Sequence, residues 1–162
     1  MVEIRDMASA DWAEVAAIYS AGLDTNNATF ETTCPRYAQW SAAHIECCRL
    51  VAVDGTQIVG WAALSPISNR SVYGGVAEVS IYLAPDSQGK GIGTQLLKQL
   101  IADSEQAGFW TLQAGILSEN TASIKLHETC GFRLVGRRER IGQDRFGVWR
   151  DTLLMERRLT QQ

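Results

Sequence analysis

The sequence lacks any long apolar segment and carries little net charge. No apolar run approaches the roughly 18 residues that a membrane-spanning helix needs, and residues 1–6 lack the apolar core of a signal peptide. The net charge is −3, and the basic residues are scattered apart from a small cluster at 137–140. A basic surface of the kind that binds nucleic acid is therefore not favoured. We expect a cytoplasmic protein whose partners are neither membranes nor nucleic acids.

Metal-binding and disulfide patterns are missing as well. Of the four cysteines, Cys47 and Cys48 are adjacent rather than spaced as a Cys-x-x-Cys pair. In a reducing compartment we expect all four to be free thiols, and we predict no metal site. The 162 residues contain no internal repeat and no low-complexity linker. This length predicts one domain, 1–162, with a substantial core.

A strand, a turn and a helix follow one another between residues 78 and 101. Residues 78–83 alternate and are rich in β-forming side chains. Residues 84–87 end the strand, because Pro85 has no N–H for the next ladder bond. Glycines then stand at every second position, Gly89, Gly91 and Gly93, and apolar residues follow at helical spacing.

This glycine-rich turn predicts a phosphate site. A turn without Cβ atoms lets main-chain N–H groups converge on a ligand, and the following helix adds unpaired N–H groups and the positive end of its dipole. Lys90 could supply charge. The Walker motif does not fit because Gly91 stands where Ser or Thr is needed, and the dinucleotide fingerprint lacks its last glycine. On spacing alone, a glycine-rich turn without a ligand remains the alternative.

The rest of the chain alternates between short strand and helix patterns. Strands are predicted at 2–5, 49–53, 57–64, 109–116, 133–141 and 145–154, with hairpin turns at Asp54-Gly55 and 142–144. Helices are predicted from 9–11 to Gly22, from 34–36 to about Glu46, from Ile92 to near Gly108, and from Asn120 to Gly131. This order predicts an α/β or α+β fold with a mixed sheet and a right-handed parallel strand–helix–strand unit.

The spacing Gln88-x-x-Gly91-x-Gly93 after a strand resembles the acetyl-CoA loop of the GNAT N-acetyltransferase superfamily, and Asn120 to Phe132 resembles its second coenzyme-contacting element. The resemblance implies a GNAT fold, with a mixed central sheet of about seven strands flanked by about four helices. It also implies acetyl-CoA as the cosubstrate. The residues implied for its binding are Ile81, Tyr82, Leu83, Gln88, Gly89, Lys90, Gly91, Ile92, Gly93, Thr94, Asn120 and Ser123.

Further motifs are similar to the phosphinothricin acetyltransferase branch, which includes the methionine sulfone and sulfoximine acetyltransferases. They are Leu126-His127-Glu128 before Gly131-Phe132, Arg70-x-x-Tyr73 ahead of Glu78, Asn27-Ala28-Thr29-Phe30, and Gly147-x-Trp149-x-Asp151. The similarity covers nearly the whole chain and implies transfer of acetyl to the α-amine of a small amino-acid analogue. Glu31 departs from the pattern, because a basic residue is sometimes found there.

The branch also implies a homodimer and a set of substrate-binding residues. The candidates are Phe30, Arg70, Tyr73 and Trp149. Arginine suits a carboxylate or phosphinate because its planar fork binds two oxygens at once. By sequence alone, each of the four could instead belong to the ordinary surface or core.

Glu78 and His127 are the candidate catalytic residues. An ammonium must lose a proton before it attacks a thioester, and Glu78 could take that proton directly or through a water. Alternatively, the Glu78 carboxylate could simply bind the substrate ammonium. The resemblance implies that a main-chain N–H near Leu83 polarises the thioester oxygen. His127 could protonate the departing thiolate, because imidazole titrates near ~6.5, or it could orient Glu78 or a water.

Two other functions remain open at this stage. The same fold could acetylate a polyamine, an antibiotic amine or a peptide N-terminus. A chain of another class would bind acetyl-CoA as a sensor or structural module without turnover. The sequence also leaves open whether the activity serves resistance or clears a metabolite.

Overall fold

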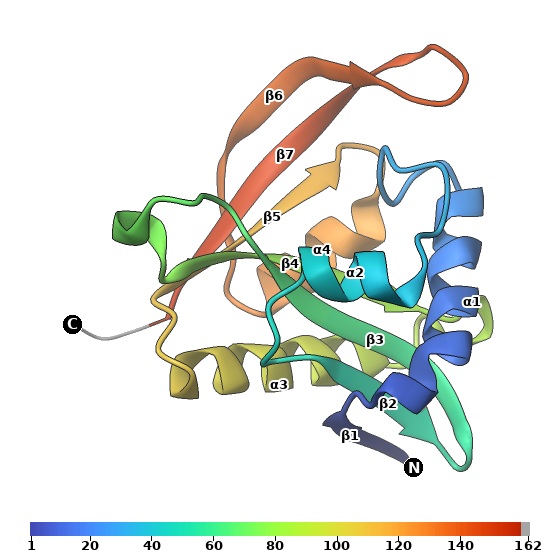
Figure 1. Ribbon diagram of the computed structural model, residues 1–162. Helices are drawn as coiled ribbons and strands as arrows, with labels where there is room; N and C mark the ends of the chain where they lie inside the picture. Colours follow the sequence, from blue (N-terminus) through green and yellow to red (C-terminus); the bar gives the residue numbers. More distant parts are fainter. Residues whose placement is uncertain (160–162) are drawn as a thin grey trace.

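The computed structural model describes residues 1–159 and arranges seven strands in one sheet (Figure 1). The strands are β1 (Val2–Asp6), β2 (Leu50–Asp54), β3 (Gln57–Pro66), β4 (Val76–Leu83), β5 (Thr111–Leu117), β6 (Arg133–Gln143) and β7 (Trp149–Arg158). Their order across the sheet is β1-β2-β3-β4-β5-β7-β6. Within residues 1–159, β4 and β5 form the one parallel pair, and the other neighbours are antiparallel. The predicted mixed α/β sheet is confirmed.

Helices cover both faces of this sheet (Figure 1). They are α1 (Trp12–Asp24), α2 (Tyr37–Ala43), α3 (Ile92–Gln106) and α4 (Thr121–Thr129), with short 3-10 turns at Ser9–Asp11, Ser71–Tyr73 and Pro85–Ser87. Because side chains alternate along a strand, the core divides into one cluster under α3 and another under α1 and α2. No helix in the described part of the chain is long and apolar enough to cross a membrane.

The apolar stripe on α3 anchors that helix against the sheet. Leu96, Leu97 and Leu100 on this stripe are fully buried. Each such leucine contributes about 1.5–3 kcal/mol of burial free energy. The stripe therefore holds the first turn of α3 in place beside the end of β4.

The prediction that Gly22 ends the first helix is wrong. The helix α1 continues to Asp24, and Thr25 caps it by donating both its N–H and its Oγ1 hydrogen to the Gly22 carbonyl. The reason for glycine at this position is packing. A Cβ at Gly22 would lie 2.6 Å from Cδ2 of Tyr82, which is closer than real Cβ contacts come.

The second helix is also shorter than predicted. It occupies Tyr37–Ala43 rather than 34–46. His44 is already extended, and the next residue, Ile45, donates its N–H to the carbonyl of Leu64 on β3. The chain therefore leaves the helix in order to join the sheet.

The closing hairpin was predicted to turn at 142–144, and this is wrong. β6 continues to Gln143, and the turn lies at 144–148. Asp144 shapes it, because one carboxylate oxygen accepts hydrogen bonds from the N–H groups of Phe146 and Val148. The strand predicted at 109–116 is likewise shifted, to Thr111–Leu117.

The parallel strands β4 and β5 separate after three residue pairs. Val76 to Glu78 pair with Thr111 to Gln113, and no further pairs follow along β4 and β5 in the described chain. On the other edge of β4, Ala84 donates its N–H to Val59 on β3 at 2.8 Å. Because N–H groups alternate between the two edges of a strand, the N–H groups of Ile81 and Leu83 face the gap where β5 has moved away.

Candidate active site

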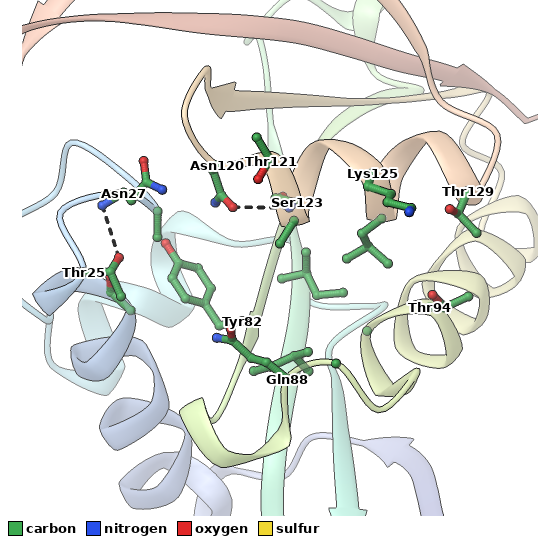
Figure 2. Close-up of a pocket in the computed structure, with 18 of the residues that line it drawn as sticks. Thr25, Asn27, Tyr82, Gln88, Thr94, Asn120, Thr121, Ser123, Lys125 and Thr129 are labelled. Atoms are coloured by element: carbon green, nitrogen blue, oxygen red, sulfur yellow. Dashed lines mark hydrogen bonds between the residues drawn. The ribbon is translucent and has the colours of Figure 1, made fainter.

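A cavity of about 830 Å³ opens where β4 and β5 separate. Figure 2 shows its walls, with Tyr82 and Gln88 below, α4 above, and Thr25 and Asn27 to one side. Its lining comes from three regions: the end of α1 and the loop after it, β4 with the glycine turn, and α4 with the two residues before it. Elements far apart in sequence therefore build one pocket.

The glycine turn presents unpaired main-chain donors to this pocket. Gly91 is the N-cap of α3 in the left-handed region (φ +80), and no side chain caps the helix. Gly89 also has a positive φ (+76), and a Cβ at either glycine would meet nothing within 4 Å. The first N–H groups of α3 are thus free to bind an anion at the positive end of the helix dipole.

The opposite wall is one face of α4, from its first residue to its last. Asn120 caps the helix as predicted, because its Oδ1 accepts the N–H of Ser123 at 3.2 Å. Ala122, Lys125, Leu126 and Thr129 face the same cavity at spacings of three and four residues. Lys125 places a cation beside the free donors of α3, so this end of the cavity suits a polyanionic ligand (Figure 2).

The residues predicted to bind acetyl-CoA largely meet here. Those that line the cavity are Ile81, Tyr82, Leu83, Gln88, Gly89, Gly91, Gly93, Thr94, Asn120 and Ser123. Lys90 is exposed outside it, and the Ile92 side chain lies in the core, so Ile92 can offer only its N–H.

Sequence reasoning missed Gly22 and Thr25 on one side of the cavity, and on the other Glu119, Thr121, Ala122 and the lining residues of α4 after Ser123. The α4 residues recur at helical spacing on the Asn120 face, a signal that could have found them. Nothing in the local sequence marks Thr25 or Glu119.

Glu78 lies at the point where the two parallel strands separate. Its Oε1 accepts a hydrogen bond of 3.0 Å from Nε2 of Gln113, its partner residue on β5. Because side chains alternate along β4, Glu78 points to the same face as Tyr82, the face covered by α1 and α2. The carboxylate is half-buried; Gln113 holds its Oε1, and Oε2 is available to another partner.

His127 lies on the inner side of α4 and does not line the cavity. Its side chain is only 2% exposed, and its ring packs edge-on against Phe132. Nδ1 lies 2.7 Å from the carbonyl of Ser123, which can only accept, so Nδ1 carries the hydrogen. Nε2 is buried with no hydrogen-bond partner in the described chain. Burial lowers the pKa of His127, so the ring is neutral near pH 7.

The four predicted substrate-binding residues also lie outside the cavity lining. Arg70 and Tyr73 form a pair on the exposed loop before β4, with the guanidinium carbon 5.6 Å from the ring centroid. Phe30 lies against Gly142 on β6. Trp149 is half-exposed, with Arg140 over its ring. The structure therefore does not gather these four residues into one site.

The pocket fits acetyl-CoA. The free donors of α3, the open space over Gly89 and Gly91, and Lys125 suit the pyrophosphate, and the unpaired N–H groups of Ile81 and Leu83 suit a carbonyl oxygen. A family model described as the acetyltransferase (GNAT) family matches residues 12–132. The chain belongs to the GNAT acetyltransferase family. It is therefore an acyltransferase with acetyl-CoA as its cosubstrate.

Several GNAT enzymes resemble the chain over nearly its whole length. Phosphinothricin N-acetyltransferase of Alcaligenes faecalis is 35% identical and covers 96% of this chain and 82% of its own. The L-methionine sulfoximine/L-methionine sulfone acetyltransferase of Pseudomonas paraeruginosa is 33% identical over 94% of this chain and 92% of its own. The chain is therefore similar to N-acetyltransferases of the phosphinothricin and methionine sulfoximine type.

Solved structures give the same architecture. A phosphinothricin acetyltransferase from Sinorhizobium meliloti, in complex with acetyl-CoA, has a TM-score of 0.88 and 34% identity and covers 98% of this chain and 88% of its own. A ribosomal-protein-alanine N-acetyltransferase from Brucella melitensis has a TM-score of 0.90 and 33% identity, covering 97% and 99%. The predicted GNAT fold is confirmed, whereas the two structures differ in the acceptor that their names give.

Proposed function

We propose that this GNAT enzyme transfers acetyl from acetyl-CoA to the α-amine of a small amino-acid analogue such as phosphinothricin, methionine sulfone or methionine sulfoximine. The transfer is a direct attack within a ternary complex. The observation that carries the proposal is the Glu78 carboxylate, held by Gln113 where β4 and β5 separate. The names of the two relatives supply the acceptor class.

Glu78 is the proposed general base. The acceptor reaches the enzyme as an ammonium, and Glu78 takes one proton from it directly or through a water. The amine nitrogen then bonds to the acetyl carbon, the carbon–sulfur bond breaks, and the sulfur leaves as a thiolate. The acetylated nitrogen gives up a second proton, and the thiolate takes one up, so that the products are the amide and CoA. The hydrogen bond from Gln113 fixes one oxygen of Glu78 and leaves the other for the proton.

The main-chain N–H of Leu83 is the proposed oxyanion donor. It faces the gap between β4 and β5, where no strand pairs with it in the described chain. A preorganised donor aimed at developing negative charge is typically worth about 3–4 kcal/mol of barrier. The strand separation thus supplies both the space and the donor.

His127 is better suited to an orienting role than to acid catalysis. Its ring is neutral, buried against Phe132 and absent from the cavity lining. Its hydrogen bond to the Ser123 carbonyl ties the inner side of α4 together. We therefore propose that His127 supports the helix that carries Asn120 and Ser123.

We propose that Arg70, paired with Tyr73, binds the acceptor carboxylate. Phe30 and Trp149 lie at the β6–β7 hairpin, apart from this pair, and take no part in this proposal. The Arg70 guanidinium is exposed on the loop before β4 and can bind two oxygens at once. Replacing Arg70 with alanine is expected to raise KM for an amino-acid acceptor, which carries a carboxylate. KM for spermidine, which carries none, should not change.

A thiol-release assay tests the acceptor class. Acetyl-CoA is supplied with phosphinothricin, methionine sulfone, methionine, spermidine and an alanine-terminated peptide. We expect fast CoA release with the first two. Turnover confined to spermidine would refute the acceptor class but leave the acetyltransferase activity standing. Binding of acetyl-CoA without CoA release in the presence of any of the amines would indicate a non-catalytic module.

A peptide N-terminus is the second candidate acceptor. The observation that favours it is the Brucella melitensis structure, which matches this chain as well as the phosphinothricin enzyme does. A peptide acceptor needs an open groove to receive the chain beyond its first residue. Turnover of the alanine-terminated peptide above that of methionine sulfone would establish this candidate.

We also propose a homodimer that forms through the β6–β7 hairpin. Apolar side chains are exposed along it, namely Leu134, Val135, Ile141, Phe146, Val148 and Trp149. Four of them, Ile141, Phe146, Val148 and Trp149, lie at or next to the turn of the hairpin. Exposed apolar surface of this kind marks an association surface, and a two-fold contact would cover it on both copies. Sedimentation equilibrium is expected to give twice the chain mass, falling to one chain in Phe146→Ser. A wild-type monomer at micromolar concentration would rule the dimer out.

Replacing Gly91 with alanine should weaken acetyl-CoA binding about tenfold. Residues with a Cβ pay roughly 1–2 kcal/mol in the left-handed region. The free turn of the variant therefore relaxes out of the conformation that binds, and acetyl-CoA must restore it at that cost; a tenfold change in affinity corresponds to about 1.4 kcal/mol. Calorimetric titration with acetyl-CoA measures the effect.

Gly55→Ala is the matched control for this experiment. Gly55 has φ +66 in the β2–β3 turn, also with nothing within 4 Å of a Cβ, but lies away from the cavity. The Gly55→Ala variant should lose as much folding stability as Gly91→Ala but keep the wild-type affinity for acetyl-CoA. Equal loss of affinity in both variants would mean that the glycine turn has no special part in binding.

A further inference from the structure

Arg150 on β7 joins three segments that are far apart in sequence. Its Nη1 donates to the Asn26 carbonyl at 2.9 Å and to Asp144 Oδ2 at 3.2 Å. Its Nη2 donates to Asn27 Oδ1 at 2.9 Å, and both Nη2 and Nε donate to Glu119 Oε1. The side chain is only 11% exposed. One guanidinium thus binds the loop after α1, the residue before Asn120 and the β6–β7 turn.

Two of these contacts are themselves walls of the active-site cavity. Asn27 and Glu119 both line it, and both bind the same nitrogen, Nη2 of Arg150. Arg150 therefore fixes the loop after α1 against the residue before Asn120 along this part of the wall. Glu78, the proposed base, does not line the cavity but lies on the same face of β4 as Tyr82, which does.

Asp144, in the β6–β7 turn, is the second carboxylate that binds Arg150. Its carboxylate accepts hydrogen bonds from the side chain of Asn26 and from the N–H groups of Phe146 and Val148, as well as from Arg150. Desolvation alone would raise the pKa of this carboxyl, but these hydrogen bonds outweigh it and lower the pKa of Asp144 to about 2. The anion that anchors Arg150 is therefore present throughout the working pH range.

We propose that Arg150 is a positioning residue for the acceptor, which it serves by locking the loop 25–28 against Glu119. The inference rests on the proposed acetyl transfer, because the acceptor must reach the face of β4 that carries Glu78 and Tyr82, and this loop lines the cavity together with Tyr82. Lysine cannot replace it, since a single ammonium group cannot reach Asn27, Glu119 and Asp144 at once. Misplacing a bound reactant by about 1 Å can cost up to a hundredfold in rate.

Arg137 on β6 is the matched control. It also carries an ion pair on this hairpin, with its Nε 2.7 Å from Asp151 Oδ2, but it is half-exposed and joins β6 only to β7. Arg137→Met removes the same charge without touching the cavity walls. If Arg150 acts by positioning the cavity walls, its substitution must therefore change the acceptor kinetics and the Arg137 substitution must not.

The experiment compares Arg150→Met, Arg150→Lys and Arg137→Met by acceptor kinetics and by calorimetric titration with acetyl-CoA. For Arg150→Met and Arg150→Lys we expect kcat/KM for methionine sulfone to fall about tenfold or more, with the acetyl-CoA dissociation constant changed less than about threefold. Arg137→Met should match the wild type in both quantities. Unchanged kcat/KM for the acceptor in Arg150→Met, or equal loss of acetyl-CoA affinity, would overturn the proposal.

Hydrogen exchange separates this inference from the acetyl-transfer proposal. Amides in residues 25–31 should exchange faster in Arg150→Met and Arg150→Lys than in Arg137→Met, whichever amine is the true acceptor. If exchange rises but no amine is turned over, the proposed function fails and the loop contact stands. If exchange in this loop stays at the wild-type rate, Arg150 does not lock it and the inference fails.

Discussion

Glu78→Gln should lower kcat by about a hundredfold to ten-thousandfold, the range that general bases contribute. Glutamine keeps the shape of the side chain, and its amide oxygen can still accept the hydrogen bond from Gln113. The change therefore removes the basic oxygen and the charge with little else. Steady-state kinetics with methionine sulfone and saturating acetyl-CoA measure the effect.

The same variant separates the two roles open to Glu78. If the carboxylate is the base, kcat falls and KM for the acceptor changes little. If it only binds the substrate ammonium, acceptor KM rises and kcat at saturation is nearly preserved. Glu105→Gln, on the exposed side of α3, is the control for loss of one negative charge and should behave as the wild type. Normal kinetics in Glu78→Gln would remove Glu78 from the mechanism.

His127→Gln is expected to give the contrasting result. Because His127 is buried and neutral and does not line the cavity, its loss should lower stability more than kcat. The pH profile of kcat should keep its wild-type shape. A profile that loses one limb in this variant would instead identify His127 as the acid that protonates the thiolate.

The fold could be predicted wherever the signal is local. Pro85 and the glycines at 89 and 91 mark the strand–turn–helix unit within a few residues, and Asn120 marks the start of α4 by its own capping bond. The errors in the helix boundaries came from contacts that are distant in sequence, whereas the β6–β7 turn was misplaced because the local bonds of Asp144 were not recognised. Gly22 looked like a helix end, but Tyr82 on β4 dictates the glycine.

The candidate site divides in the same way. The acetyl-CoA side is built from two contiguous motifs, so their resemblance to the GNAT family could propose it, whereas spacing alone left a turn without a ligand open. The acceptor side depends on which loops meet, and the residues that join them, Asn26, Glu119, Asp144 and Arg150, span more than a hundred positions. Burial could not be read locally either, because His127 carries no sequence sign that it faces inward.

Gly22→Ala should be destabilising, against the expectation from helix propensity. Alanine within a helix is favoured over glycine by about 1 kcal/mol. The new Cβ would, however, lie 2.6 and 2.7 Å from two ring carbons of Tyr82. That ring is held by Trp61 stacked at 5.0 Å and by Tyr19 at 5.0 Å, so it can relieve the clash only by moving toward the cavity that it lines. Overpacking of this kind costs about 1–3 kcal/mol, which exceeds the propensity gain over most of its range.

A double-mutant cycle decides whether Tyr82 is the cause. In the Tyr82→Ala background the clash is gone, and Gly22→Ala should then stabilise the protein by up to about 1 kcal/mol. The sign of one substitution thus reverses with the identity of a residue sixty positions away. Denaturant unfolding of the wild type, the two single variants and the double variant measures the coupling free energy. In the Gly22→Ala single variant the affinity for acetyl-CoA should also fall, because the displaced Tyr82 ring lines the cavity. If Gly22→Ala has the same effect in both backgrounds, glycine at this position serves some contact other than Tyr82, and the core and the cavity are not coupled through this ring.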